Sequence, residues 1–465
     1  MAAQKEVIHF IGIGGIGMSG IARLYLKDTN YVVTGSDAND SEIVTALREF
    51  GAKVHIGHNT ENVHGATMIV KSSAIRDTNP EIMEANRLSI PILHRSTALA
   101  ILFNKSFGIS VAGTHGKTTT SSMMSEMLTN TNSSPSFVVG GIIRNLGTNA
   151  SVGDSDLFVI EADESDGSLV SYNPNIAIIT NIDLDHMDHY ANINALHSVF
   201  LRHIGNIKKG GCLIWCKDCK QLNVVMDKVV RKDMKIVSYG INKGDIQAKN
   251  IVYNGVICGF DVVRYGEKIG HFELSIPGRH NVLNTLAVIE AGLQLNKGID
   301  DIKASLEHCL GSKRRFQVLY ADENNQPLLV DDYAHHPTEI RATLAAARSV
   351  ARNRKLIVAF QPHRYSRTVA LANEFGKAFD VADEIIVCPI YAAGETPIDG
   401  VDHNMILCKI EYANIGRHKD IYSVKDLCEL ENIIVKKISS NALVMTLGAG
   451  NINQISNKIA AEMKL

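Results

Sequence analysis

SFGISVAGTHGKTTT, residues 106–120, is the segment from which the fold class of this chain follows. Its apolar first half predicts a strand, and Gly-Lys-Thr opens a helix after a tight turn. This pattern is typical of a phosphate-binding loop, although Val111 occupies the place of the first glycine in the usual G-x-x-x-x-G-K-T form. In such a loop backbone N–H groups surround phosphate oxygens, the lysine reaches the β- and γ-phosphates, and the threonine binds Mg²⁺. The predicted ATP-binding residues of the loop are Ala112, Gly113, Thr114, His115, Gly116, Lys117 and Thr118.

Acidic residues follow two apolar strands downstream of this loop. The predicted strand at 158–160 runs into EADESD, residues 161–166, and the strand at 176–181 runs into a second polar cluster at 183–188. The carboxyl ends of parallel strands form ligand sites, and carboxylates that repel one another favour a cation such as Mg²⁺, which prefers oxygen ligands. A solvated acidic loop is the alternative for either cluster alone, but two clusters beside a phosphate loop favour the metal.

A second Gly-rich loop, GIGGIG at residues 12–17, lies near the start of the chain. It follows an apolar strand and opens a helix, and Asp37 ends the next strand at the spacing expected of a ribose-binding acid. Glycines let the backbone approach a diphosphate, and the helix N-terminus supplies N–H donors. The motif alone favours NAD; a UDP-sugar is another ligand with a diphosphate, and a tight turn without a ligand is the structural alternative.

The chain alternates apolar strands with amphipathic helices, which predicts an α/β fold with mostly parallel sheets. Its 465 residues are enough for several domains. We expect a Rossmann-like domain at 1–105, a P-loop ATPase-like domain at 106–312 and a second Rossmann-like domain at 313–465.

Composition excludes several classes of function. With a formal net charge of −2, the chain has no broad basic field for nucleic acid or an anionic membrane. No segment has the pattern of a signal peptide or a membrane span, so we expect a cytoplasmic protein with free thiols. Cys212, Cys216 and Cys219 form a cluster, but no second Cys/His pair follows at zinc-site spacing, which favours incidental thiols over a metal site.

Polar motifs also mark the last third of the chain. DDYAHHPTEI at 331–340 and FQPHRYSRT at 360–368 follow predicted strands and contain five candidate site residues, Tyr333, His335, His363, Arg364 and Arg367. Arg364 and Arg367 suit recognition of a carboxylate or phosphate, whereas a surface loop is the alternative for the histidine-containing segment.

Taken together, these motifs resemble the Mur ligase family over nearly the whole chain. The resemblance is carried by GIGGIGMSGIA at 12–22, GTHGKT at 113–118, EADESD at 161–166, DDYAHHPTEI at 331–340, FQPHRYSRT at 360–368 and GAGN at 448–451.

The resemblance implies that a UDP-sugar, rather than a dinucleotide, binds the first loop. Gly14 to Gly17 would hold its diphosphate. The full set of implied UDP-substrate residues is Gly12, Gly14, Gly15, Ile16, Gly17, Met18, Ser19, Asp37, Ser72 and Ser73.

Roles for the ATP and amino-acid sites are implied in the same way. Thr118, Glu161 and His186 would bind Mg²⁺. His280, Asn281 and Asn284 would contact adenine, with helix capping as the alternative for His280. Arg314 or Arg315 would face the γ-phosphate, and Asp331 or Asp332 would contact the nucleotide ribose. The residues implied for the amino acid and acyl phosphate are Tyr333, His335, His363, Arg364 and Arg367.

The implied reaction is ATP-dependent joining of L-alanine to the carboxylate of UDP-N-acetylmuramate through an acyl phosphate, with release of ADP and phosphate. His335 or His363 would accept the amine proton, and the sequence does not choose between them. The implied catalytic residues are Lys117, Glu161, His186, His335, His363 and Arg364.

Three alternatives remain open. A sister Mur ligase that attaches a preformed peptide would be expected to lack the Gly14-Gly15 pair. An NAD-dependent oxidoreductase leaves Lys117, Glu161 and His186 unexplained, and a non-enzymatic UDP-sugar-binding regulator would not need Lys117 or Glu161. Several family members carry a carbamylated lysine after the metal-binding histidine, and residues 190–202 here contain no lysine. Oligomeric state and tolerance for glycine or L-serine stay open.

Overall fold

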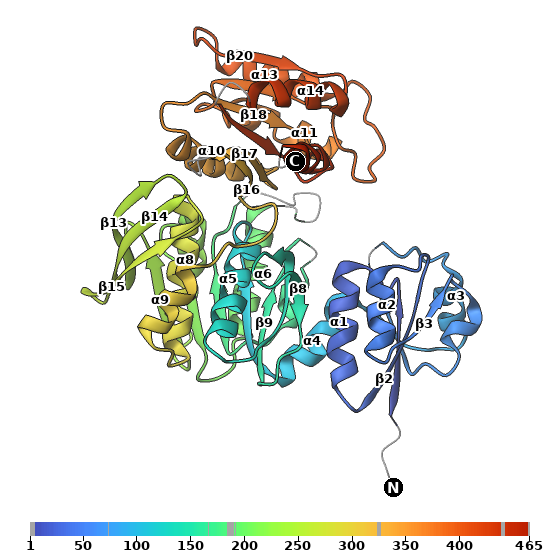
Figure 1. Cartoon of the computed structure of the whole chain (residues 1–465). Coiled ribbons are helices and arrows are strands. Elements are labelled where there is room, and N and C mark those ends of the chain that lie inside the picture. Colours follow the sequence, from blue (N-terminus) through green and yellow to red (C-terminus); the bar gives the residue numbers. More distant parts are fainter. Residues whose placement is uncertain are drawn as a thin grey trace. The chain divides into compact units, whose positions relative to one another are not determined.

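The structure, a computed structural model, describes residues 5–72, 74–165, 167–183, 190, 192–322, 327–438 and 442–463 (Figure 1). The chain forms two compact units. The first comprises residues 1–247, 263–267 and 284–305, and the second comprises residues 248–262, 268–283 and 306–465.

The first unit begins with a five-stranded parallel sheet in the order β3-β2-β1-β4-β5. The order reverses between β1 and β4, and ligands bind at the carboxyl ends of strands at such a point. The Gly-rich loop follows β1 directly. The elements are β1 (Glu6–Ile11), α1 (Ile16–Lys27), β2 (Tyr31–Asp37), α2 (Glu42–Glu49), β3 (Lys53–Ile56), η1 (Thr60–Val63), β4 (Met68–Lys71), α3 (Pro80–Arg87), β5 (Ile92–His94) and α4 (Arg95–Lys105).

A ten-stranded sheet follows, in the order β15-β14-β13-β12-β11-β10-β6-β9-β7-β8. The strands around β6 are parallel, and β8 is antiparallel to β7. Strand β6 is almost wholly buried, as its apolar sequence predicts. The strands of this sheet and the helices between them are β6 (Phe107–Ala112), α5 (Lys117–Asn130), β7 (Ser136–Ile143), β8 (Thr148–Ser151), β9 (Leu157–Glu161), η2 (Ser168–Ser171), β10 (Ile176–Ile179), α6 (Ile193–Gly205), β11 (Cys212–Cys216), α7 (Lys220–Met226), β12 (Lys235–Gly240), β13 (Ile246–Asn254), β14 (Ile257–Arg264), β15 (Glu267–Leu274), α8 (Arg279–Gln294) and α9 (Ile299–Glu307).

The last sheet has six strands in the order β16-β17-β21-β18-β19-β20, all parallel except for β16 against β17. The sequence pattern missed β16 and placed the start of this sheet at the following strand. The elements are β16 (Gln317–Ala321), β17 (Pro327–Asp332), α10 (Pro337–Ala351), β18 (Leu356–Phe360), α11 (Tyr365–Ala370), α12 (Ala372–Gly376), β19 (Glu384–Val387), α13 (His403–Ala413), β20 (Asp420–Ser423), α14 (Leu427–Ile438), β21 (Leu443–Leu447) and α15 (Ile452–Glu462).

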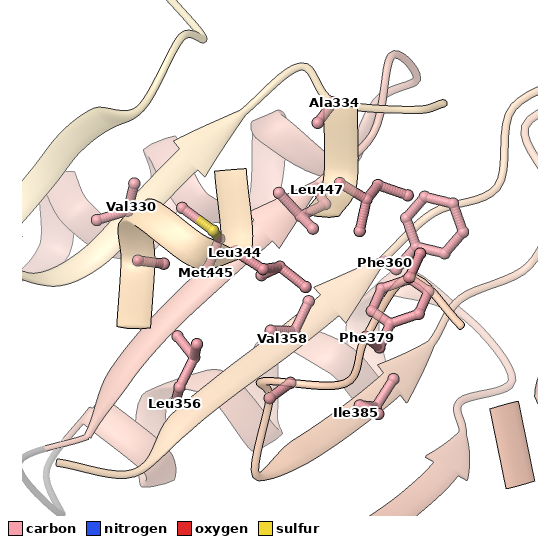
Figure 2. Packing of buried hydrophobic residues seen from close by; sticks show 14 of the residues in the cluster. Val330, Ala334, Leu344, Leu356, Val358, Phe360, Phe379, Ile385, Met445 and Leu447 are labelled. Atoms are coloured by element: carbon pink, nitrogen blue, oxygen red, sulfur yellow. The ribbon is translucent and has the colours of Figure 1, made fainter. Parts of the chain in front are cut away.

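Both faces of this last sheet are covered by apolar side chains. Figure 2 shows one face, where Val358 and Phe360 of β18 lie with Leu344 of α10 and Phe379. On the other face Ile357 and Ala359 belong to a second cluster that includes residues of α14 and α15. The predicted α/β class with mostly parallel sheets is confirmed, whereas the domain boundaries near 105 and 312 stay predictions.

Candidate functional site

The phosphate loop joins β6 to α5 through two glycines in left-handed conformations. Gly113 has φ +131° and Gly116 has φ +82°. A side chain on Gly113 would collide with Thr180 Oγ1, and a Cβ on Gly116 would lie 2.8 Å from Asn284 Oδ1. Glycine is therefore required at both positions by backbone conformation and by space.

The end of β10 fixes the shape of this loop. The His115 N–H donates to Asn181 Oδ1 at 2.9 Å, while Thr180 Oγ1 and Asn181 Nδ2 donate to the His115 carbonyl at 2.6 and 2.9 Å. The Asp183 N–H donates to Thr114 Oγ1 at 3.0 Å. Sequence reasoning missed the roles of Thr180 and Asn181; the available signal was a polar pair at the end of an apolar parallel strand.

Lys117 begins α5 and is surrounded by carboxylates. Its Nζ lies 2.7 Å from Glu164 Oε2 and 3.5 Å from Asp163 Oδ1. Burial alone would lower the pKa of Lys117. The negative charges of Glu164, Asp163 and Glu161 outweigh the effect of burial, and the pKa of Lys117 therefore lies above its ordinary value. Lys117 is therefore a fixed positive charge at the mouth of the loop.

Glu161 ends β9 beside this lysine. Its Oε1 accepts a hydrogen bond from Thr118 Oγ1 at 3.0 Å, and its Oε2 accepts one from the Gly140 N–H at 2.7 Å. Burial raises the pKa of Glu161, and the nearby Asp163 adds to the rise. Two of the three predicted metal ligands, Thr118 and Glu161, are thus in direct contact, while His186 lies outside the described residues.

The Gly-rich loop of the first sheet uses most of its own N–H groups internally. The N–H groups of Gly12 and Ile13 donate to the Ser36 carbonyl at 2.8 and 3.0 Å, and that of Gly15 donates to the Gly12 carbonyl at 3.1 Å. The Gly14 N–H donates to Asp37 Oδ2 at 2.8 Å. Asp37 therefore holds the loop in shape, and its predicted contact with a ribose stays a prediction.

Helix α1 follows this loop, and its cap residue makes no side-chain capping bond. The first N–H groups of a helix have no partner within it, so the first turn, which contains Gly17 and Met18, is the part of this loop suited to an anion. Ser72 follows β4 in the same sheet, and Ser73 lies outside the described residues. The substrate roles of Ile16, Ser19 and Ser72 stay predictions.

A pocket of about 370 Å³ connects the Gly-rich loop with Glu161. Its volume is in the range of small-molecule sites. It contains hydroxyl and amide groups suited to a sugar as well as charged groups. The lining residues are Gly17, Ile21, Arg95, Ser96, Leu99, Val138, Val139, Gly140, Asn149, Glu161, Asp163, Ser168 and Tyr172.

A cluster of aromatic rings lies at the carboxyl ends of β17 and β18, in the second unit. The His335 ring lies 5.3 Å from that of Tyr333 and 5.7 Å from that of His363, and the His363 ring stacks on Tyr391 at 5.7 Å. Arg367 Nη1 lies 3.3 Å from His363 Nδ1. The structure therefore brings together four residues that the sequence predicted for the amino-acid site and adds Tyr391.

Both histidines of this cluster are neutral near pH 7. Burial lowers the pKa of His335 to about 4 despite the nearby carboxylate of Glu339. Burial also lowers the pKa of His363 to about 4, with contributions from His335, Arg367 and Arg364. A neutral imidazole can accept a proton, so both residues are chemically available as bases.

Arg364 has φ +71° and ψ 140°, a combination that non-glycine residues rarely adopt. The backbone places Arg364 at the N-terminus of α11, where its N–H donates to the Tyr391 carbonyl at 2.9 Å. Backbone strain of this kind is concentrated at functional sites, which agrees with its predicted role.

Two arginines and two aspartates flank the ring cluster. The guanidinium carbons of Arg314 and Arg315 lie 4.9 and 5.2 Å from the centre of the Tyr333 ring. Asp332 accepts hydrogen bonds from the Phe316 and Ala334 N–H groups, both at 2.7 Å, and burial raises its pKa to about 6.

Asp331 instead accepts a hydrogen bond from Thr446 Oγ1 at 2.8 Å and lies 3.4 Å from Arg314 Nε. Both aspartates thus make bonds that organise the start of this domain. The predicted ribose contact of Asp331 or Asp332, and the choice between Arg314 and Arg315 for the γ-phosphate, stay predictions.

The three residues predicted to contact adenine lie at the start of α8. Asn284 lies next to Gly116 of the phosphate loop, as described above. His280 has its pKa lowered to about 4 by burial and by Arg315, and the Asn281 side chain donates to the Pro277 carbonyl at 2.8 Å. Adenine contacts by His280 and Asn281 stay predictions.

Comparison with known proteins places the chain in a family. Three family models match, the Mur ligase family, catalytic domain at residues 7–107, the Mur ligase middle domain at 111–292, and the Mur ligase, glutamate ligase domain at 314–450. The UDP-N-acetylmuramate–L-alanine ligase of Geotalea daltonii is 41% identical and covers 100% of this chain and 99% of its own. That of Syntrophotalea carbinolica is 41% identical, covering 99% and 98%.

Solved structures of related ligases agree with the family matches. The UDP-N-acetylmuramate-alanine ligase of Thermotoga maritima has a TM-score of 0.79 and 31% identity, covering 98% of this chain and 99% of its own. A murein peptide ligase of Psychrobacter arcticus, at 23% identity, shares the fold with a TM-score of 0.65 and 98% coverage of both chains. Within the described ranges, no helix has the length and hydropathy of a membrane span. The chain belongs to the Mur ligase family.

Proposed function

We propose that this protein is an ATP-dependent ligase that joins L-alanine to the carboxylate of UDP-N-acetylmuramate and releases ADP and phosphate. A new C–N bond forms after the carboxylate has been converted to an acyl phosphate. The product is a precursor of peptidoglycan.

One observation carries this proposal: a single pocket is lined both by Gly17 of the Gly-rich loop and by Glu161 of the phosphate-transfer site. A substrate whose diphosphate lies at one end can therefore extend its sugar and carboxylate toward the other. An NAD-dependent oxidoreductase has no use for a phosphate loop at the far end of such a pocket. The full-length relatives named for this activity give independent support.

The residues of the phosphate loop suit ATP and Mg²⁺. Thr118 Oγ1 and Glu161 Oε1 are adjacent oxygens, and Glu161 lies among other carboxylates in a buried setting that disfavours uncompensated negative charge. Thr118, Glu161 and His186 would hold the metal, which supplies charge neutralisation to the phosphates when bound. Lys117, already charged and positioned by Glu164, would stabilise the charge on the transferred phosphoryl group.

Attack by L-alanine requires an unprotonated amine. His335 and His363 are both neutral near pH 7, so either would be able to accept this proton through a ring nitrogen, although a pKa of about 4 makes each a weaker base than an ordinary histidine. Arg364 and Arg367 would bind the amino-acid carboxylate or the acyl phosphate, and Tyr333 would shape the pocket around them. In this arrangement positioning provides most of the rate enhancement.

Phosphate release in the presence of ATP, Mg²⁺, UDP-N-acetylmuramate and each of L-alanine, glycine and L-serine tests the proposal. We expect release that requires both the UDP-sugar and an amino acid, with L-alanine preferred. Release that required a preformed peptide in place of an amino acid would indicate the sister ligase activity. UDP-sugar binding without any ATP turnover would indicate a regulator.

A further inference from the structure

Arg95 begins α4 and is exposed at the edge of the pocket described above. Its guanidinium lies directly over the first turn of α1, because a Cβ added to Gly17 would lie 2.5 Å from Arg95 Nη1. Across the described ranges of the chain, no hydrogen bond or ion pair is found for this side chain. An arginine with several unused donors therefore faces the part of the Gly-rich loop that is suited to an anion.

The loop itself supplies few donors. The N–H groups of the Gly12 to Gly15 segment are bonded to Ser36, Asp37 and Gly12. A diphosphate that carries two negative charges would otherwise meet only the first turn of α1. A nearby guanidinium provides the missing positive charge and a planar pair of donors that matches phosphate oxygens.

The position of Arg95 also disfavours a structural role. The N-terminus of a helix carries partial positive charge, so a cation in the first turn is unfavourable. Helix α4 has no acidic residue in its first turn to offset Arg95, and its capping bond is made by the His94 side chain to the Ser96 N–H. Among the described residues Arg95 therefore neither bonds to another side chain nor stabilises its own helix, and a bound anion over α1 would give it a partner.

We propose that Arg95 binds the diphosphate of the uridine nucleotide and so sets the position of the sugar in the pocket. This inference rests on the proposed function, and it assigns a role in substrate positioning to a residue outside the Gly-rich loop. With the diphosphate held between Arg95 and α1, the rest of the substrate extends along the pocket toward Glu161, where its carboxylate must react.

Calorimetric titration of Arg95→Gln and Arg95→Lys with UDP and with uridine tests the inference. We expect Arg95→Gln to weaken UDP binding by roughly 10- to 100-fold, as for loss of a hydrogen bond to a charged group, and to leave uridine binding unchanged. Arg95→Lys should fall between this variant and the wild type. Arg202→Gln is the matched control, because Arg202 is an exposed arginine of α6.

Two further measurements separate ligand binding from folding. The Tm of Arg95→Gln should equal or exceed that of the wild type, because an unfavourable charge is removed from the start of α4. In the ligase assay, KM for UDP-N-acetylmuramate should rise while KM for ATP and kcat change little.

Equal affinity of Arg95→Gln and wild type for UDP would overturn the inference, as would an equal loss of UDP and uridine affinity or a lower Tm. If those results came with normal alanine-dependent turnover, the proposed function would stand and only the role of Arg95 would fall. A wild-type protein that bound no UDP would contradict both.

Discussion

The two Gly-rich loops of the first unit have the same local structure, a strand, a turn and a helix. They differ in the surroundings of the carboxylate that lies next to each loop. Behind the first loop, buried Glu81 is satisfied by hydrogen bonds from Ser36 at 2.6 Å and from Asn62 at 2.6 Å, and by His58 at 3.1 Å. Behind the second, Glu161 is raised in pKa and crowded by other carboxylates.

This difference is the one expected between a loop that only binds a substrate and a loop that takes part in a reaction. The first loop is stabilised by a satisfied network, as expected of a site that binds a substrate and leaves it unchanged. The second concentrates Lys117 and several acids in a confined space, as expected of a reactive site whose charges a bound nucleotide and metal would balance. The predictions below test whether that contrast holds, from the largest expected effect to the smallest.

Lys117→Met should reduce turnover by about 10³-fold or more, because it removes the fixed charge that, in the proposed function, would face the transferred phosphoryl group. Binding of UDP-N-acetylmuramate, measured by calorimetry, should stay within a few-fold of the wild type because the Gly-rich loop is unaffected. Lys249→Met, at an exposed lysine, is the control. Turnover at the wild-type rate would remove Lys117 from the mechanism, and loss of UDP-sugar affinity would show that the two loops are not separate.

Replacing each buried carboxylate by its amide should change stability in opposite directions. Glu81→Gln should lower the free energy of unfolding at pH 7 by about 2 kcal/mol, because hydrogen bonds hold the Glu81 pKa at about 2 although burial opposes this shift. Glu161→Gln should abolish most turnover and yet raise the free energy of unfolding by about 1 kcal/mol, as at other strained active sites. Denaturant titrations of both variants beside the wild type measure the two signs.

The pH dependence of stability sharpens the same comparison. Since the folded pKa of Glu81 is lowered, its contribution is present above the unfolded pKa and is lost as pH falls from about 4.5 toward 2. Since the folded pKa of Glu161 is raised, its effect runs the other way, and the wild type gains stability from this group as pH falls. Between pH 3 and 7, the free energy of unfolding should change less with pH for Glu81→Gln than for the wild type. An equal change in both proteins would contradict the lowered pKa of Glu81.

Glycine substitutions should separate the two turns. Gly116→Ala should cost about 1–2 kcal/mol of stability, because an alanine at φ +82° is strained and its Cβ meets Asn284. Gly15→Ala should cost less, since φ −62° suits alanine and only the Gly12 carbonyl oxygen, 3.3 Å from the added Cβ, has to shift slightly. Thermal unfolding of the two variants side by side provides the measurement, and equal losses would refute the distinction.

The smallest expected effect is none at all: removal of CO₂ and bicarbonate should leave the rate unchanged. Lys208, a nearby lysine beyond the metal segment, donates to the Ser106 carbonyl at 2.8 Å and lies 3.2 Å from Asn175 Oδ1, at the amino end of β6. The phosphate loop lies at the opposite end of that strand. A rate loss that added bicarbonate restored would show that another lysine is carbamylated.

Local patterns in the sequence predicted the parts of the site that follow directly from a strand. The phosphate loop, Glu161 and the histidine segments lie at strand ends, and a short stretch of chain specifies them. Contacts between distant segments were not predicted, such as Asn181 with His115 and Gly140 with Glu161, since single-sequence patterns carry no information on which strands become neighbours. Strand β16 was also missed: it is an edge strand that pairs antiparallel with β17, and a single sequence does not show that pairing.

The bonds from the end of β10 to His115 mean that the phosphate loop is not a portable module. Residues 112–118 transplanted alone into another parallel sheet would lose Thr180 and Asn181, which hold the His115 peptide from both sides. A designer who wished to reuse this loop would have to move two neighbouring strands as one piece. For the same reason we expect substitutions in the loop to be tolerated in evolution only when the tip of the adjacent strand changes with them.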